Sequence, residues 1–249
     1  MELVHIQEKI SEPIELLVPK QQHEPPVSEN NEPLILMKEE HPRIFIKSMY
    51  YIQNIPNSLK FIYLRKGVYE RIQQALNILP KNLSFILYDG YRPFEVQKHL
   101  FNQFLDETKK KHPEYTQEEV LEKTLTFVSY PSTESKYRSP HLTGGAIDLT
   151  LGDLEGNELD LGTVFDAMDE KSATRYFELH PKENGEALIN RRILYNSMIA
   201  VGFTNYSEEW WHYDYGNVTW ARRVGAPVGI YGAIEADVHD NIIKGYRYI

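Results

Sequence analysis

The chain contains no cysteine among its 249 residues, which excludes disulfide bonds and thiolate metal ligands. Any transition metal would therefore be bound by imidazole and carboxylate groups. Basic residues are also few, with 27 Lys and Arg against 36 Asp and Glu and a formal net charge of −9. Without a basic cluster there is no footprint for a phosphate backbone, so no nucleic-acid partner is expected.

Long apolar runs are missing as well. The first residues carry an early acid, no basic segment and no uninterrupted apolar segment, and no apolar run reaches the length that spans a bilayer. We therefore expect no membrane partner and a cytoplasmic location. The hydrophobic content of 41% is enough for one substantial core.

Composition divides the chain into three predicted ranges. Residues 1–40 combine five prolines with acids and amides, which disfavours helix and offers little apolar surface, so they should form an arm or linker. The short apolar patch from Ile14 to Val18 could dock as an edge strand or belong to a mobile tail. Residues 41–223 would form the main domain. In residues 224–249, alternating apolar residues could add a hairpin or a dimer contact.

Periodicity predicts a mixture of helices and strands. Apolar residues three or four positions apart, with a capping box at Thr116 and Glu119, predict helices over about 66–79, 96–104, 116–127 and 188–201. Apolar or aromatic runs predict strands over about 83–88, 146–151 and 209–215. Since no regular alternation of strand and helix appears, we predict an α+β fold with an antiparallel sheet and flanking helices.

A first cluster of chemically active residues lies between Ser139 and Asp148. Two glycines allow a tight turn between His141 and an acid set between Ile147 and Leu149. A carboxylate in an apolar strand is costly unless it is paired, hydrogen-bonded or bound to a metal. Spacing alone leaves two interpretations open, a metal site or a turn-capping acid beside a surface histidine.

A second cluster is Glu208-Glu209-Trp210-Trp211-His212-Tyr213. Its aromatic side chains would exclude water from a site, where charges act strongly. On a regular strand Glu209 and His212 would point to opposite faces, so a bend is needed for both to reach one ion. Alone, this motif would favour an aromatic core strand that ends in a solvated histidine.

Together the two clusters supply His141, Asp148 and His212 as three ligands and leave Glu209 uncommitted. This is the set of groups in a catalytic zinc site that keeps its fourth position for water. Glu209 would be the general base and acid. The other seven histidines fall in no comparable cluster and should be structural or solvated.

Arg92 is the candidate for stabilising an oxyanion, because it lies in a predicted strand-to-helix turn. From the sequence alone, a surface arginine paired with a helix acid is the more favoured interpretation of this residue.

These residues resemble a known family, the zinc D-alanyl-D-alanine dipeptidases, typified by the vancomycin-resistance dipeptidase and related to D,D-carboxypeptidases. The resemblance covers about residues 66–215. The matching stretches are Tyr88–Pro93, Ser139–Leu151, Gly162–Glu170, Asn190–Arg192 and Glu209–Tyr213. It implies a zinc D,D-peptidase (hedgehog-like) architecture, with residues 41–223 as the catalytic domain.

The resemblance also implies the site. One Zn²⁺ per chain would be held by His141, Asp148 and His212, with Glu209 as the base and Arg92 at the tetrahedral intermediate. It further implies that Ser139 and Asp166 help to hold the free amino group of a small peptide, D-Ala-D-Ala. The stretch from Met49 to Asn54 matches only loosely, which leaves open which tyrosine near residues 50–51 contacts the substrate.

Two rival functions remain open. A carboxypeptidase or endopeptidase acting on peptidoglycan stem peptides would work outside the membrane, and the lack of a signal peptide disfavours it. A non-catalytic zinc-containing peptide-binding module would need no spare acid, whereas this sequence offers Glu209. A homodimer is compatible with the sequence.

Overall fold

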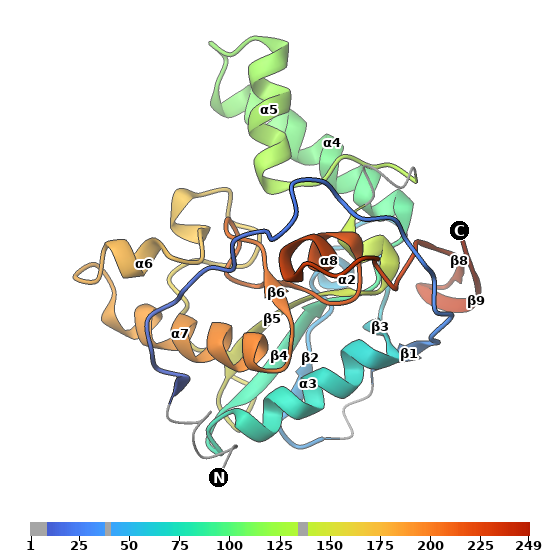
Figure 1. The fold of residues 1–249 in the computed structure, drawn as a ribbon. Coiled ribbons are helices and arrows are strands. Elements are labelled where there is room, and N and C mark those ends of the chain that lie inside the picture. Colours follow the sequence, from blue (N-terminus) through green and yellow to red (C-terminus); the bar gives the residue numbers. More distant parts are fainter. Residues whose placement is uncertain (1–8, 38–40, 134–138) are drawn as a thin grey trace.

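A five-stranded sheet lies at the centre of the computed structural model, which describes residues 9–37, 41–133 and 139–249 (Figure 1). Its strands are, in spatial order, β2 (Ile44–Ile46), β4 (Ser84–Asp89), β5 (Ala146–Gly152), β7 (His212–Asp214) and β6 (Thr204–Asn205). Neighbouring strands are antiparallel except for the β2–β4 pair, which is parallel. The predicted α+β class with an antiparallel sheet is confirmed. The strand β2 was not predicted from the sequence, because its three residues are too few to show a periodic pattern.

Helices and two small strand pairs surround this sheet. The longer helices are α3 (Lys66–Ile78), α4 (Phe94–Lys111), α5 (Gln117–Phe127), α7 (Gly185–Ala200) and α8 (Val218–Val224). The short ones are α2 (Met49–Ile52), α6 (Tyr176–Leu179) and the 3₁₀ turns η2 (Pro140–Thr143) and η3 (Glu170–Ser172). The two-stranded sheets pair β1 (Leu34–Leu36) with β3 (Tyr63–Arg65) and β8 (Ile234–His239) with β9 (Ile242–Tyr248).

The predicted helices form where the periodicity placed them. The capping box of α5 is present, because the Thr116 side chain accepts from the Glu119 backbone and the Glu119 side chain accepts from the Thr116 backbone. Helices α4 and α5 pack on each other and project from the body of the molecule (Figure 1).

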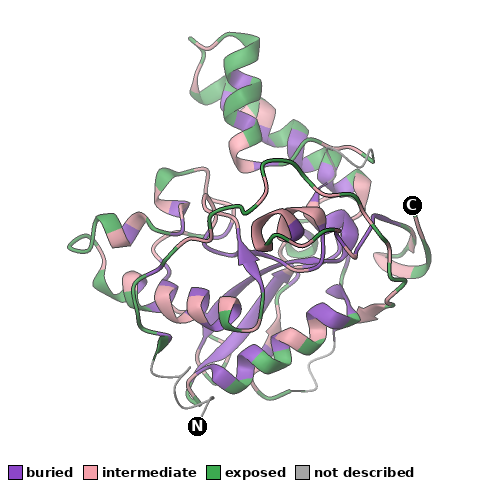
Figure 2. Cartoon of the chain, viewed as in Figure 1, coloured by how far each residue is buried: buried purple, intermediate pink, exposed green. Residues whose placement is uncertain are grey.

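The core lies between the sheet and the pair α3 and α7, which contact each other. Side chains alternate along β5, so Ile147 and Leu149 enter this core while Asp148 points to the other face. Figure 2 shows the central strands as buried and the outer faces of the helices as exposed. Burying each large apolar side chain contributes about 1.5 to 3 kcal/mol, so this core holds β5 rigidly beneath Asp148.

The described part of the N-terminal arm lies along the surface of the molecule (Figure 1). Ile14 is 1% exposed and joins the core, yet no strand forms from Ile14 to Val18. Pro13 and Pro19 flank this patch and lack the backbone N–H donor that strand pairing requires. The patch therefore docks through the side chain of Ile14 and forms no strand. Further on, the arm exchanges backbone hydrogen bonds with residues 222–230.

The C-terminal residues form the hairpin β8–β9, one of the two alternatives for this tail. The hairpin packs beside β1 and β3, where Ile234 and Ala233 are fully buried. The boundaries at residues 40 and 223 stay predictions, as does a homodimer. In the part of the chain that the structure describes, no helix is long and apolar enough to cross a bilayer. The cytoplasmic location also stays a prediction.

Candidate active site

Strand register brings three polar residues into one row across the sheet. Asp148 on β5 pairs with His212 on β7 and with Asp89 on β4. Cross-strand neighbours lie on the same face, so these side chains meet although they are up to 123 positions apart along the chain, from residue 89 to residue 212. The strand pairing, which the sequence could not specify, therefore builds this part of the site.

His141 joins the row from the turn η2, which ends at Gly144 with a φ of +67°. The Nδ1 atom of His141 lies 2.8 Å from the carbonyl oxygen of Gly90, which can only accept a hydrogen bond. Nδ1 therefore carries a proton, and Nε2 is the nitrogen that faces Asp148 and His212. The glycine turn thus aims Nε2 of this imidazole at the acid.

His141, Asp148 and His212 can hold a metal ion. They are the one group of three or more potential ligands that meet among the described residues, and all three are buried. His141 Nε2 lies 3.1 Å from His212 Nδ1 and 3.3 Å from Asp148 Oδ2, and His212 Nδ1 lies 3.0 Å from Asp148 Oδ1. Bonds of 2.0 to 2.2 Å to a tetrahedral ion separate ligand atoms by about 3.3 to 3.6 Å, so these donors fit zinc with small adjustments.

The charges around these three side chains also favour a bound cation. The pKa of Asp148 is lowered, because His141 and His212 stabilise its charge against the cost of burial. The pKa of His212 is raised in spite of burial, because Asp214 and Asp148 face its two nitrogens. Two acids that both stabilise positive charge at one imidazole would stabilise a bound cation in the same way.

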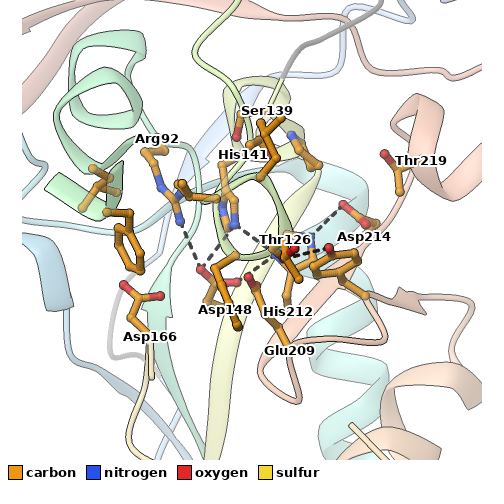
Figure 3. Close-up of a pocket in the computed structure, with 18 of the residues that line it drawn as sticks. Arg92, Thr126, Ser139, His141, Asp148, Asp166, Glu209, His212, Asp214 and Thr219 are labelled. Atoms are coloured by element: carbon orange, nitrogen blue, oxygen red, sulfur yellow. Dashed lines mark hydrogen bonds and ion pairs between the residues drawn. The ribbon is translucent and has the colours of Figure 1, made fainter. Parts of the chain in front are cut away.

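Arg92 is buried at this site and is not a surface arginine. Its Nε donates to Asp89 at 2.8 Å and its Nη1 to Gln97 at 2.8 Å, while Nη2 lies 3.2 Å from the Tyr50 hydroxyl and 3.3 Å from Asp148 Oδ2. The pKa of Arg92 is raised, since these neighbours offset the cost of burial. Figure 3 shows the guanidinium pointing toward Asp148.

Glu209 lies in the turn between β6 and β7, three residues before His212. This turn is the bend that the sequence required, because it brings Glu209 and His212 to one cavity. Burial raises the pKa of Glu209 to about 8, with Asp148 adding to the rise and His212 opposing it. A carboxyl group with such a pKa can exchange protons near neutrality.

Ser139 and Asp166 line the same cavity. The Ser139 hydroxyl donates to Gln97 at 3.1 Å, which leaves its oxygen able to accept. Asp166 accepts a hydrogen bond of 2.8 Å from the Tyr50 hydroxyl, and burial raises its pKa to about 7. Tyr51 is 38% exposed, so Tyr50 is the tyrosine of its segment that reaches the site.

The cavity that these groups enclose has a volume of about 270 Å³. In Figure 3 the carboxylates of Asp166 and Glu209 point into the space beside the three metal-ligand candidates. Apolar side chains of α4 and α5, such as Phe104 and Leu125, form the outer wall, and Glu24 of the arm also lines the cavity. The volume suits a small molecule, and the charged lining residues Arg92, Asp166 and Glu209 suit one with charged ends.

Gln97 and Asp214 belong to this site but were not predicted from the sequence, and Tyr50 was one of two open candidates. The sequence position of Asp214 weakly indicated that it belongs to the site, because it lies two residues after His212 and so on the same face of a strand. Nothing in the sequence indicated a role for Gln97, since glutamine is common on amphipathic helices. His5 lies outside the described residues, so the expectation for it stays a prediction.

Fold and site together define a hydrolase built around a metal-binding pocket with a free glutamate and a buried arginine. Residues 55–226 match the Peptidase_M15 family model, described as D-ala-D-ala dipeptidase, and the chain belongs to this family of peptidases.

Proteins named D-alanyl-D-alanine dipeptidase are similar to the chain. The protein from Synechocystis is 27% identical over 176 residues, which cover 64% of this chain and 71% of that protein. The protein from Escherichia coli is 33% identical over 152 residues, 61% of this chain and 65% of the relative. The protein from Enterococcus faecium is 35% identical over 158 residues, 59% of this chain and 71% of the relative.

Two solved structures also resemble this chain. One is the vancomycin-resistance D,D-pentapeptidase VanY from a VanB-type cassette with Zn(II), with 17% identity, a TM-score of 0.45 and coverage of 86% of this chain and 94% of the other. The other is VanXYg with a D-Ala-D-Ala phosphinate analogue, with 21% identity, a TM-score of 0.38 and coverage of 88% and 70%.

Proposed function

We propose that this protein hydrolyses the dipeptide D-Ala-D-Ala with one Zn²⁺ bound by His141, Asp148 and His212. The observation that carries the proposal is the convergence of these three buried donors beside an uncommitted Glu209. When bound, zinc would polarise the peptide carbonyl and lower the pKa of a water to about 7.

Glu209 is the general base and then the general acid. Its carboxylate takes the proton of the attacking water and delivers one to the nitrogen of the leaving D-alanine. The raised pKa of about 8 supports the second half of this role, because the carboxyl group must hold the proton between the two steps. A bound cation would favour the ionised form that begins the reaction. No other acid is needed for the transfer.

Arg92 stabilises the negative charge that develops on the carbonyl oxygen. Its guanidinium is fixed by Asp89, Gln97 and Tyr50, so no reorganisation is needed when the charge appears. Burial strengthens the interaction, since water does not screen it.

Asp166 and Ser139 hold the free amino group of the substrate. A carboxylate is the natural partner of an ammonium, and the Ser139 oxygen can accept one of its N–H bonds. A site that requires a free ammonium selects dipeptides over longer peptides, whose corresponding nitrogen is a neutral amide. This requirement separates the proposal from a carboxypeptidase acting on stem peptides.

A panel of substrates tests the proposal. Purified, zinc-loaded protein is incubated with D-Ala-D-Ala, with L-Ala-L-Ala and with a peptidoglycan stem peptide that ends in D-Ala-D-Ala, and released D-alanine is measured. We expect release from D-Ala-D-Ala only, with kcat about 10² to 10⁴-fold lower in Glu209→Gln at unchanged zinc content. Release from the stem peptide would support the carboxypeptidase instead, and no turnover by either protein would support a binding module.

A further inference from the structure

Arg191 is a buried cation outside the reacting centre. It lies on α7 and is 1% exposed, and no ion pair with a carboxylate is found for it within the described ranges. Burial lowers its pKa to about 9. Burying a charged group in this way is costly, so the contacts of the guanidinium must offset the cost.

All three nitrogens of Arg191 donate to one loop. Nε donates to the carbonyl oxygen of Leu161, Nη1 to that of Ala173 and Nη2 to that of Lys171, each at 2.7 Å. These three carbonyls bracket Asp166. One rigid, planar group thus fixes both ends of the loop that presents this carboxylate.

The same guanidinium lies where the loop meets the turn of Glu209. Its Cζ lies 4.6 Å from the centre of the Phe177 ring and 5.8 Å from that of Trp210. Trp210, which follows Glu209, donates from Nε1 to Thr163 Oγ1 at 2.8 Å and from its backbone to the Ser172 carbonyl at 3.0 Å. Arg191 therefore supports the face where the loop and the catalytic turn join.

Asp166 needs such support because of its backbone. It has a φ of +59°, in the left-handed region that side chains other than glycine rarely adopt, so surrounding contacts must maintain this conformation. The hydrogen bond from Tyr50 holds the tip of its side chain but not the loop.

We propose that Arg191 is a positioning residue that sets the substrate-binding geometry of Asp166 through the loop of residues 161–173. The proposal rests on the role of Asp166 as the anchor of the substrate ammonium. Arg191 itself touches neither the substrate nor the metal ligands. Its loss should therefore weaken the recognition of the ammonium more than the chemical step.

The test compares D-Ala-D-Ala with N-propionyl-D-alanine, which has the same shape but lacks the amino group. For Arg191→Met we expect the preference for D-Ala-D-Ala, as a ratio of kcat/KM values, to fall at least tenfold, mostly through KM. Arg191→Lys keeps the charge and the apolar stem, so it should fold securely and lose part of the preference. Zinc content and Tm are measured for every variant.

Arg192→Met is the matched control. Arg192 is the next residue on α7 and pairs with Glu178 at 2.7 Å, away from the loop carbonyls. We expect its substrate preference to stay within twofold of the unmodified protein. If Arg191→Met and Arg191→Lys lower activity on both substrates equally, Arg191 is only structural and the inference is overturned.

Asp166→Asn separates this inference from the proposed function. If it keeps the preference for D-Ala-D-Ala, the anchoring role of Asp166 is wrong. If it abolishes the preference while both Arg191 variants retain it, the positioning role of Arg191 alone is wrong.

Discussion

The imidazole of His212 donates from Nε2 to the buried carboxylate of Asp214, with 3.2 Å between Nε2 and Oδ1. Asn217 donates to the same oxygen at 2.7 Å and fixes the carboxylate in turn. Because Nε2 carries a proton, Nδ1 is the nitrogen that would bind a metal ion in the space between Asp148 and His141. Asp214 thus sets both the tautomer and the direction of a metal ligand.

Replacing Asp214 by asparagine should weaken zinc binding by about 10 to 100-fold, because the imidazole loses its charged orienting partner. The zinc dissociation constant is measured by competition with a chromogenic chelator. The hairpin offers a matched control, since Asp237 and His239 form an exposed pair of the same spacing at 3.0 Å. Asp237→Asn should leave zinc affinity unchanged, and equal affinities for both variants would argue against the orienting role of Asp214.

Tyr50→Phe should lower kcat/KM for D-Ala-D-Ala by about 10 to 100-fold. The variant keeps the ring that lies 4.8 Å from the Arg92 guanidinium but loses the hydroxyl that links Arg92 to Asp166. A hydrogen bond to a charged group contributes about 1.5 to 3 kcal/mol, which corresponds to this change. Steady-state kinetics provide the measurement.

Tyr51→Phe is the control for this substitution. Tyr51 is the next residue on α2 and does not line the cavity. Its kcat/KM should remain within twofold of the unmodified protein. Equal losses in the two variants would point to a general disturbance of α2 and not to a role of the Tyr50 hydroxyl.

The sequence predicted the elements whose stability is local. Helices α3, α4, α5 and α7 follow from apolar residues one turn apart, and the capping box at Thr116 marks the start of α5. The apolar run around Asp148 predicted β5, and the cost of burying an acid there, combined with the second cluster at Glu209 and His212, predicted a metal ligand.

Residues whose roles depend on tertiary contacts could not be predicted in this way. Gln97 meets Ser139 across 42 positions, and Tyr50 approaches Asp166 across 116 positions. The docking of Ile14 depends on α7, where Tyr195 donates to the Glu15 carbonyl. No spacing in the sequence encodes these meetings, since they follow from the packing of separate elements.

The acid limb of the pH profile should report the two buried acids that must be ionised, Asp166 and Glu209. An ammonium needs the ionised carboxylate of Asp166, whose pKa burial raises to about 7, and proton transfer from water needs the ionised carboxylate of Glu209, whose pKa burial raises to about 8. The value of kcat/KM for D-Ala-D-Ala should therefore rise with pH up to about 8. A bound cation favours the ionised form, so the midpoint should lie at or below this value. An alkaline limb near about 8 should follow the loss of the substrate's own ammonium.

Two changes test these assignments of the pH profile, one in the protein and one in the substrate. Asp166→Asn cannot ionise, so its lower activity should lose the part of the acid limb that belongs to ammonium binding. With N-propionyl-D-alanine as substrate, the alkaline limb near 8 should also disappear. An unchanged acid limb in Asp166→Asn would assign that ionisation to another group.

Gly162→Ala should destabilise the protein by at least about 2 kcal/mol, a loss expected where a left-handed conformation coincides with a steric clash. Gly162 has a φ of +90°, and a Cβ atom there would collide with the Phe177 ring, which packs against the Arg191 guanidinium. The free energy of unfolding is measured in urea. Gly185→Ala is the control, because a Cβ at the first residue of α7 meets nothing within 4 Å and should be neutral or stabilising by about 0.5 kcal/mol. If Gly162→Ala is as stable as Gly185→Ala, the loop can shift freely and would not hold Asp166 in a defined position.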